Sequence, residues 1–293
     1  MAKLRGVSPE KIEKRLKLLM FGPAGSGKTT AAIQFPRPYL IDTERGAEND
    51  QYVRLLAEAG GAYFPTTDFE ELVSEITALL SEAHEYRTLI IDPITVVYSD
   101  LLDKASTKVG TDFGRHYGEA DKRMRHLTNL LTRLDMNVIV TSHAKNLYGP
   151  KLEVIGQTFD GWKRLDYLFD LVIELAKRGR ERVGIVRKTR IEAFEDGAVI
   201  GPWSYEAVSN MYGADLLERV SRPEAIATPD QVADLSRLVA TLNIPADQVE
   251  RWLDKARAES LSEMPASAIV KCIEWCRAKI AAATKTATTT GEE

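Results

Sequence analysis

The sequence predicts an α/β fold with a mostly parallel sheet, followed by a small helical domain. Short apolar runs alternate with amphipathic helical segments over the first half of the chain. A glycine-rich segment joins the first apolar run to a helix, and only helical patterns occur after residue 230. Strands that alternate with helices form βαβ units, whose strands are parallel.

Four short apolar runs are typical of buried strands, and they span 16–21, 39–42, 88–92 and 137–141. The prolines of FPRP end a helix just before the second run. Segment 69–83 carries apolar residues at helical spacing. Helices are also predicted for 47–59, 93–105 and 119–135. A polar loop is predicted for 106–113, between the last two of these helices.

The pattern changes after residue 141. No clear element is predicted for 144–166, whereas 170–175 and 182–187 alternate around KRGRE and predict an antiparallel hairpin at the sheet edge. The predicted organisation begins with an N-terminal extension at 1–15 and an α/β core at 16–221. A linker at 222–229, a domain of three short helices at 230–281 and a disordered tail at 282–293 follow.

Composition favours a soluble cytoplasmic protein. The 293 residues are 44% apolar and 28% charged, and no apolar run has transmembrane length. The two cysteines, Cys272 and Cys276, lie one helical turn apart outside any metal motif, which fits thiols in a reducing compartment. The net charge of −4 does not exclude DNA binding, because segment 177–190 is locally basic.

Residues 22–29, GPAGSGKT, form a complete phosphate-binding loop of the pattern G-x-x-x-x-G-K-[ST]. Glycines allow the backbone N–H groups to surround phosphate oxygens, Lys28 can reach the β- and γ-phosphates, and the Thr29 hydroxyl can bind Mg²⁺. The predicted cofactors are therefore ATP and Mg²⁺. The predicted nucleotide-binding residues are Gly22, Pro23, Ala24, Gly25, Ser26, Gly27, Lys28, Thr29 and Thr30.

Two carboxylates fit the remaining chemistry. Asp92 ends the apolar run TLIID, so it should reach the sheet edge beside the phosphate loop and hold the metal with Thr29. Glu44 follows the second strand and is the candidate catalytic base that activates water. Each has an alternative interpretation: Asp92 as a strand-end cap, and Glu44 as an exposed loop residue beside Arg45.

The succession GPAGSGKT, IDTE, LIID and VIVTSH resembles the RecA-type P-loop ATPase core. This resemblance implies that Glu44 is the catalytic glutamate and that His143 is a γ-phosphate sensor, where family members usually carry an amide. It also implies that Lys188 and Arg190, in VRKTR, reach a neighbouring subunit's γ-phosphate, with ATP sites between subunits of a ring or filament. The alternative for these cations is a solvated basic face.

The segment GPAGSGKTTAAIQFPRPYLIDTERGA more specifically resembles small phage ATPases of the Sak-type single-strand annealing group, over roughly residues 15–210. The resemblance implies an ATP-hydrolysing recombinase that binds single-stranded DNA and promotes annealing or strand pairing. The C-terminal helices resemble appendages of such proteins, for which a single-strand-binding protein is one candidate partner. The host cytoplasm is then the expected location.

Segment 143–165 occupies the position of the family's second DNA loop. Its cations can follow a phosphate backbone, and aromatics in such a loop can stack on bases. The candidate DNA contacts are Lys145, Lys151, Lys163 and Arg164, whereas Phe159 and Trp162 are better explained as core packing. Two other functions stay open: an ATPase in helicase loading or a regulatory switch, and a non-hydrolysing assembly protein stabilised by ATP.

Overall fold

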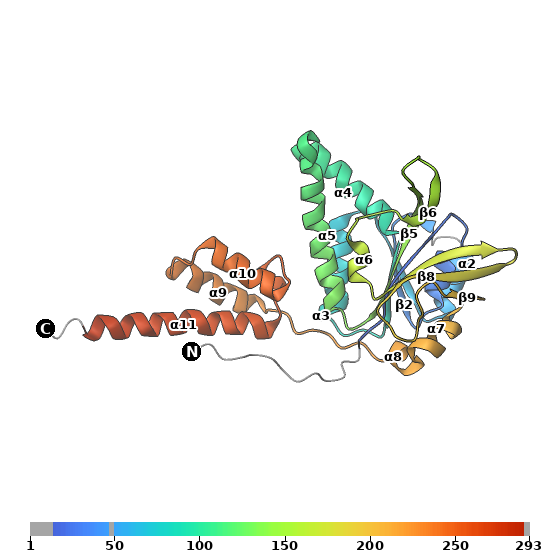
Figure 1. The fold of residues 1–293 in the computed structure, drawn as a ribbon. Helices are drawn as coiled ribbons and strands as arrows, with labels where there is room; N and C mark the ends of the chain where they lie inside the picture. Colours follow the sequence, from blue (N-terminus) through green and yellow to red (C-terminus); the bar gives the residue numbers. More distant parts are fainter. Residues whose placement is uncertain (1–13, 47–49, 290–293) are drawn as a thin grey trace.

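The computed structural model describes residues 14–46 and 50–289. Within them, one nine-stranded sheet has the order β3-β2-β4-β5-β1-β7-β8-β9, with β6 paired to β5 (Figure 1). The strands are β1 Lys17–Gly22, β2 Pro38–Asp42, β3 Ala62–Pro65, β4 Thr88–Asp92, β5 Asn137–Tyr148, β6 Val154–Phe159, β7 Leu171–Arg178, β8 Glu181–Thr189 and β9 Val199–Ile200.

The six strands from β3 to β7 are parallel, and β8 and β9 add an antiparallel edge. All six residues of β1 are buried, as its continuous apolar sequence predicts for a central parallel strand. Strand β5 lies between β1 and β4. This topology confirms the predicted α/β fold with a mostly parallel sheet and an antiparallel edge hairpin.

Helices cover both faces of the sheet. The helices α3 Phe69–Ser81, α4 Ile94–Val109, α5 Arg115–Arg133 and α6 Leu165–Leu168 pack on one face. The other face carries α1 Lys28–Ile33, α2 Asp50–Glu58, α7 Tyr205–Tyr212 and α8 Ala214–Glu218. Successive β1 side chains divide between the two cores, with Leu19 and Phe21 in the first and Leu18 and Met20 in the second.

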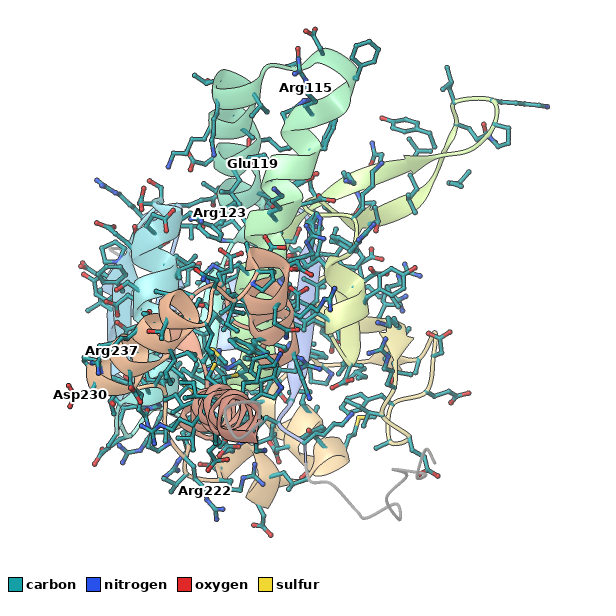
Figure 2. The ribbon with its side chains drawn as sticks, turned by 90° about the vertical axis from the view of Figure 1, so that its left-hand side faces the viewer. Arg115, Glu119, Arg123, Arg222, Asp230 and Arg237 are labelled. Atoms are coloured by element: carbon teal, nitrogen blue, oxygen red, sulfur yellow. The ribbon has the colours of Figure 1, made fainter. Side chains whose placement is uncertain are left out.

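Helices α4 and α5 form a long hairpin that projects beyond the sheet (Figure 1), and Figure 2 shows Arg115 near its tip with Glu119 and Arg123 further down α5. The predicted loop 106–113 is shorter than expected, because α4 continues to Val109. Ser106 and Thr107 donate their hydroxyls to the carbonyl of Asp103, so these polar side chains bond within the helix. A short 3₁₀ turn, η2 Asp112–Gly114, joins the helices.

The prediction that 144–166 lacks regular structure was wrong. Strand β5 continues to Tyr148 and turns back into β6, which forms a projecting hairpin (Figure 1). The hairpin projects into solvent and exposes apolar residues such as Tyr148 and Ile155. It therefore lacks the alternation of buried apolar and exposed polar residues by which strands are usually recognised. Strand β3 and the helices α7 and α8 were also absent from the sequence-based assignment.

The C-terminal helices are α9 Pro229–Thr241, α10 Ala246–Ala256 and α11 Ala266–Thr289, with a 3₁₀ turn η3 Leu261–Glu263. They surround their own apolar cluster, in which Cys272 and Cys276 are buried free thiols. A disordered tail was expected at 282–293, but α11 continues to Thr289 and its alanines favour helix; 290–293 lie outside the described residues. No helix in the described part of the chain is both long and apolar enough to cross a bilayer.

Candidate functional site

The phosphate loop leaves β1 at its carboxyl end and enters α1. Gly25 and Gly27 have φ values of 71° and 93°, which only glycine adopts without strain. A Cβ on Gly22 would lie 2.4 Å from the carbonyl oxygen of Leu175, so glycine is also required there by close backbone packing. The loop conformation therefore follows directly from its three glycines.

Lys28 and Thr29 begin α1, and both already contact the site. The Lys28 ammonium donates to the carbonyls of Gly22 at 3.0 Å and Pro23 at 3.3 Å. The Thr29 hydroxyl donates to Asp92 Oδ2 at 2.5 Å. The two side chains expected to share a magnesium ion thus lie within direct contact at the end of β4.

Asp92, the last residue of β4, is partly buried. Burial raises the pKa of its carboxyl group, while hydrogen bonds from Thr141 and Thr29 and the charge of Lys28 act in the opposite direction. Thr141, in the buried part of β5, donates to Asp92 Oδ1. The sequence analysis did not assign Thr141 a role, although its position as the last residue of NVIVT was a usable signal. A carboxylate oxygen is a hard ligand of the kind that Mg²⁺ prefers.

Glu44 lies two residues beyond β2. Its backbone N–H donates to the buried Asp42 carboxylate at 3.1 Å, and the Thr43 hydroxyl donates to the Pro93 carbonyl at 2.7 Å. Asp42 therefore holds the turn that presents Glu44, which accounts for two acidic residues so close together. The Glu44 carboxylate contacts His143 on β5, with 3.0 Å between Oε1 and Nε2, and both side chains are about half exposed.

His143 connects this acid to the β5–β6 hairpin. Its backbone N–H donates to the Thr95 hydroxyl at 3.0 Å, and Thr95 donates to the carbonyl of Asp160 at 2.7 Å. The N–H of Asp160 in turn donates to the His143 carbonyl at 2.8 Å. The base of the hairpin is thereby tied to the same short segment that carries His143.

Arg182 is a residue near the loop that the sequence analysis missed. It lies on β8 opposite Lys177 of β7, and its guanidinium donates to the Gly25 carbonyl at 3.4 Å. Its Nε is 3.6 Å from the position that a Cβ on Gly27 would take. The contact depends on how far the β7–β8 hairpin extends past β1, and the basic run 177–190 was the available signal.

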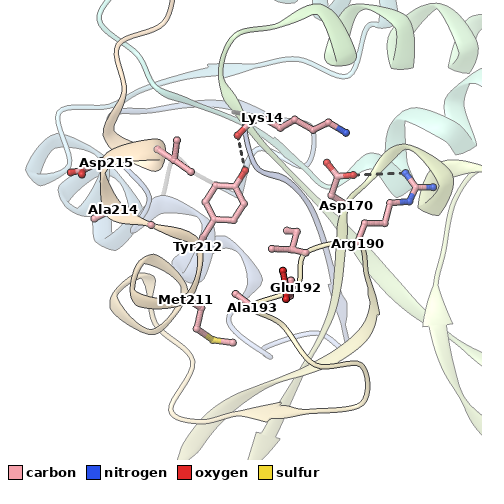
Figure 3. Close-up of a pocket in the computed structure, with 12 residues that line it drawn as sticks. Lys14, Asp170, Arg190, Glu192, Ala193, Met211, Tyr212, Ala214 and Asp215 are labelled. Atoms are coloured by element: carbon pink, nitrogen blue, oxygen red, sulfur yellow. Dashed lines mark hydrogen bonds and ion pairs between the residues drawn. The ribbon is translucent and has the colours of Figure 1, made fainter. Parts of the chain in front are cut away.

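Lys188 and Arg190 lie at the other end of the same hairpin, near the amino end of β1, because Thr189 pairs with Leu171 and Leu171 with Leu18. The Lys188 ammonium bonds the carbonyls of Asp166 and Phe169, the second at 3.0 Å. Arg190 is half exposed and lies 3.8 Å from the Asp170 carboxylate, beside a cavity lined also by Lys14 and Tyr212 (Figure 3). Neither side chain is near its own phosphate loop.

The four candidate DNA contacts lie in two places. Lys145 and Lys151 belong to the β5–β6 hairpin, where Lys145 is 3.4 Å from Asp160. Lys163 and Arg164 are exposed just before α6. Trp162 is buried and donates its indole N–H to Asp121 at 2.7 Å, in agreement with the core-packing interpretation.

The loop fits a nucleotide with magnesium. The Ser26 hydroxyl of the loop is buried without a hydrogen-bond partner within the described residues. The described residues contain no cluster of three or more His, Cys, Asp or Glu side chains that could bind a metal ion without further ligands. Magnesium typically needs only one or two carboxylates when phosphate oxygens supply further ligands, and Thr29 and Asp92 meet this requirement.

The fold and the loop define a P-loop NTPase. A protein-family model described as an AAA domain matches residues 14–195, more than half of the chain, and the protein belongs to this family. Among solved structures, the crystal structure of the RadB recombinase is similar with a TM-score of 0.39 and 19% sequence identity, covering 63% of this chain and 84% of that chain. The comparison with curated proteins gave no significant match.

Proposed function

We propose that this protein is an ATP-binding and ATP-hydrolysing recombinase of the RecA-like type, which binds single-stranded DNA and promotes annealing or strand pairing, as the Sak-type resemblance implies. One observation carries the ATPase part. The phosphate loop, the Thr29–Asp92 contact and the Glu44–His143 pair lie at the carboxyl ends of β1, β2 and β4, where His143 of β5 pairs with Gly22. Ligands of parallel α/β sheets bind at this edge.

In this proposal, Lys28 exchanges its two carbonyl partners for the β- and γ-phosphate oxygens of ATP. The pKa of Lys28 is lowered, mainly by burial, although Asp92 and Glu44 act against this effect. A triphosphate would favour the charged ammonium further. Thr29 and Asp92 hold magnesium, which would neutralise phosphate charge during transfer.

Glu44 accepts the proton of the attacking water, and His143 holds the carboxylate in position until the nucleotide is bound. Both side chains of the pair are about half exposed, so solvent reaches the carboxylate, and Asp42 fixes the turn that carries Glu44. His143 can then turn from Glu44 to a γ-phosphate oxygen. Because His143 is tied to Asp160, this exchange would link ATP binding to the base of the β5–β6 hairpin.

The location of Arg190 supports action on a neighbouring subunit. Arg190 lies near the amino end of β1, whereas the phosphate loop of the same chain lies at the carboxyl end. The guanidinium could therefore contact a γ-phosphate only in a second copy of the chain. Half exposure and a long contact with Asp170 leave the guanidinium available. Lys188 is a weaker candidate, because two backbone carbonyls already hold its ammonium. Shared sites imply a homo-oligomer.

The projecting β5–β6 hairpin supports the DNA part of the proposal. It combines Lys145 and Lys151 with the exposed Tyr148, whose side chain is 60% accessible. Cations that neutralise phosphates and an aromatic that stacks on a base are typical of single-strand binding. Lys163 and Arg164 would extend the contact toward α6.

Two measurements test this function. ATP hydrolysis should rise with single-stranded DNA and increase more than linearly with protein concentration, because the sites are shared. Binding of a labelled oligonucleotide should weaken steeply with salt, and a Lys145→Ala/Lys151→Ala variant should reduce the slope of log K against log salt by about one to two. Lys271→Ala, on the exposed face of α11, is the matched control. Absence of oligonucleotide binding at low salt would remove DNA from the proposal.

A further inference from the structure

The phosphate loop is flanked by different chemistry on its two sides. Strand β1 lies between β5 and β7, so Glu44 and His143 approach from the β5 side and Arg182 from the β7 side. The first side carries the groups for water and the γ-phosphate. The second side carries a cation to which the proposed mechanism gives no role.

Arg182 has few partners for a charged side chain. Among the described residues, the guanidinium of Arg182 has one hydrogen-bond acceptor, the backbone carbonyl of Gly25, and no carboxylate forms an ion pair with it. The 3.4 Å contact is long for a guanidinium, whose charge-assisted bonds are usually shorter than 3 Å. Most of its five donors therefore have no protein acceptor within the described chain.

The position of the side chain indicates which ligand would satisfy these donors. Its Nε, Cδ and Cγ lie 3.6 to 3.8 Å from the site of a Cβ on Gly27, so the arm covers the Gly25–Gly27 part of the loop. In loops of this type the backbone amides surround the α- and β-phosphates, whereas the lysine reaches the β- and γ-phosphates. A glycine at residue 27 leaves the space that lets the arginine approach so closely.

We propose that Arg182 is a second nucleotide-binding cation, which acts within its own subunit on the α- and β-phosphates of the bound nucleotide. This inference rests on the proposed ATP binding. On binding, the guanidinium leaves the Gly25 carbonyl and uses its fork of N–H groups on phosphate oxygens, a geometry that arginine matches better than lysine.

The alternative is that Arg182 only caps the Gly25 carbonyl and thereby stiffens the loop. The two roles respond differently to Arg182→Gln, because glutamine keeps an N–H donor for the carbonyl but carries no charge. They also differ in nucleotide dependence. A contact with the α- and β-phosphates affects ATP and ADP equally, whereas a contact with the γ-phosphate affects only ATP.

The test is calorimetric titration of the full chain with magnesium ATP and with magnesium ADP. Arg182→Ala and Arg182→Gln should each raise the dissociation constants of both nucleotides about 10- to 100-fold, and Arg182→Lys should lose less. Arg180→Ala, in the exposed hairpin turn, is the control for general charge and should change them less than about threefold. Melting temperatures without nucleotide check that each variant is folded.

Four results would overturn the inference. Arg182→Gln could bind both nucleotides like the unaltered protein, which supports the loop-capping role. Arg182→Ala could weaken ATP alone, which would assign the cation to the γ-phosphate. Arg180→Ala could cause an equal loss, which would indicate a non-specific field. Failure of the unaltered protein to bind either nucleotide would overturn the proposed function as well, and so differs from the other three.

Discussion

The two ends of the central strands differ in what a single chain can complete. At the carboxyl end, Lys28, Thr29, Asp92 and the Glu44–His143 pair are already in mutual contact or next to the loop. At the amino end, the Arg190 guanidinium lies 3.8 Å from the Asp170 carboxylate, its one ion-pair partner within the described residues, and far from the phosphate loop. The comparison teaches that the groups at the carboxyl end already contact one another within one chain, whereas the role proposed for Arg190 at the amino end requires a second copy.

Arg190→Ala should have the largest effect on ATP turnover among the variants that distinguish the two ends. If the guanidinium completes a neighbour's site, its loss should reduce ATP turnover about 10³- to 10⁵-fold. Nucleotide affinity should stay within a fewfold, because the loop of the same chain is intact. Phosphate release under saturating ATP, together with calorimetric binding, measures both quantities.

A mixing experiment gives this prediction its control. Arg190→Ala retains the loop and Lys28→Ala retains the guanidinium, so an equal mixture of the two inactive variants should recover roughly a quarter of the unaltered rate if subunits assemble at random. Mixing Arg190→Ala with the double variant Lys28→Ala/Arg190→Ala should recover nothing. Absence of recovery in the first mixture would contradict sharing between subunits.

Glu44→Gln addresses the carboxyl end. The amide keeps the size of the side chain but cannot accept a proton, so turnover should fall about 10²- to 10⁴-fold while ATP binding is retained. Glu58→Gln, on the exposed face of α2, should leave turnover unchanged. Turnover by Glu44→Gln within a fewfold of normal would reject Glu44 as the base.

The amino end also carries Lys17, which is buried and, unlike the half-exposed Arg190, has a structural role. Its ammonium donates to the carbonyls of Leu134 and Met136, both at 3.1 Å. Burial, followed by repulsion from Arg15, lowers the pKa of Lys17 to about 7. The unfolded chain keeps this proton to much higher pH, so the free energy of unfolding should rise with pH above 7 by at most about 1.4 kcal/mol per unit.

Denaturant unfolding at several pH values between 7 and 9 measures this slope. Lys17→Met should flatten it, whatever the variant does to stability at a single pH, and Lys14→Met, with its exposed side chain, should not. An unchanged slope in Lys17→Met would mean that the lysine stays protonated in the folded protein.

Sequence reasoning was most successful where the signal is continuous in the chain. The loop GPAGSGKT and the run TLIID each contain their own chemistry, and the parallel sheet brings Thr29 and Asp92 together as expected. The alternation of apolar runs with helical segments was enough to predict the class of fold. The direct contact between Glu44 and His143 depends on strand order, which the sequence reveals only indirectly.

The features that were missed depend on distances that no local pattern encodes. Arg182 reaches the loop because the β7–β8 hairpin extends past β1, and Thr141 reaches Asp92 because β5 lies beside β4. The β5–β6 hairpin exposes its apolar residues, so its strands could not be predicted from alternation between buried apolar and exposed polar positions. Such projecting segments are expected where a surface serves binding.

The central claim is that the loop between β1 and α1 binds magnesium ATP through Lys28. Calorimetric titration of the full chain with ATP and magnesium tests it most directly, with Lys28→Ala as the comparison and melting temperature as the check of folding. The account predicts saturable binding by the unaltered protein and a loss of at least about 100-fold in Lys28→Ala. No heat of binding with the unaltered protein, or equal affinity in the variant, would contradict it.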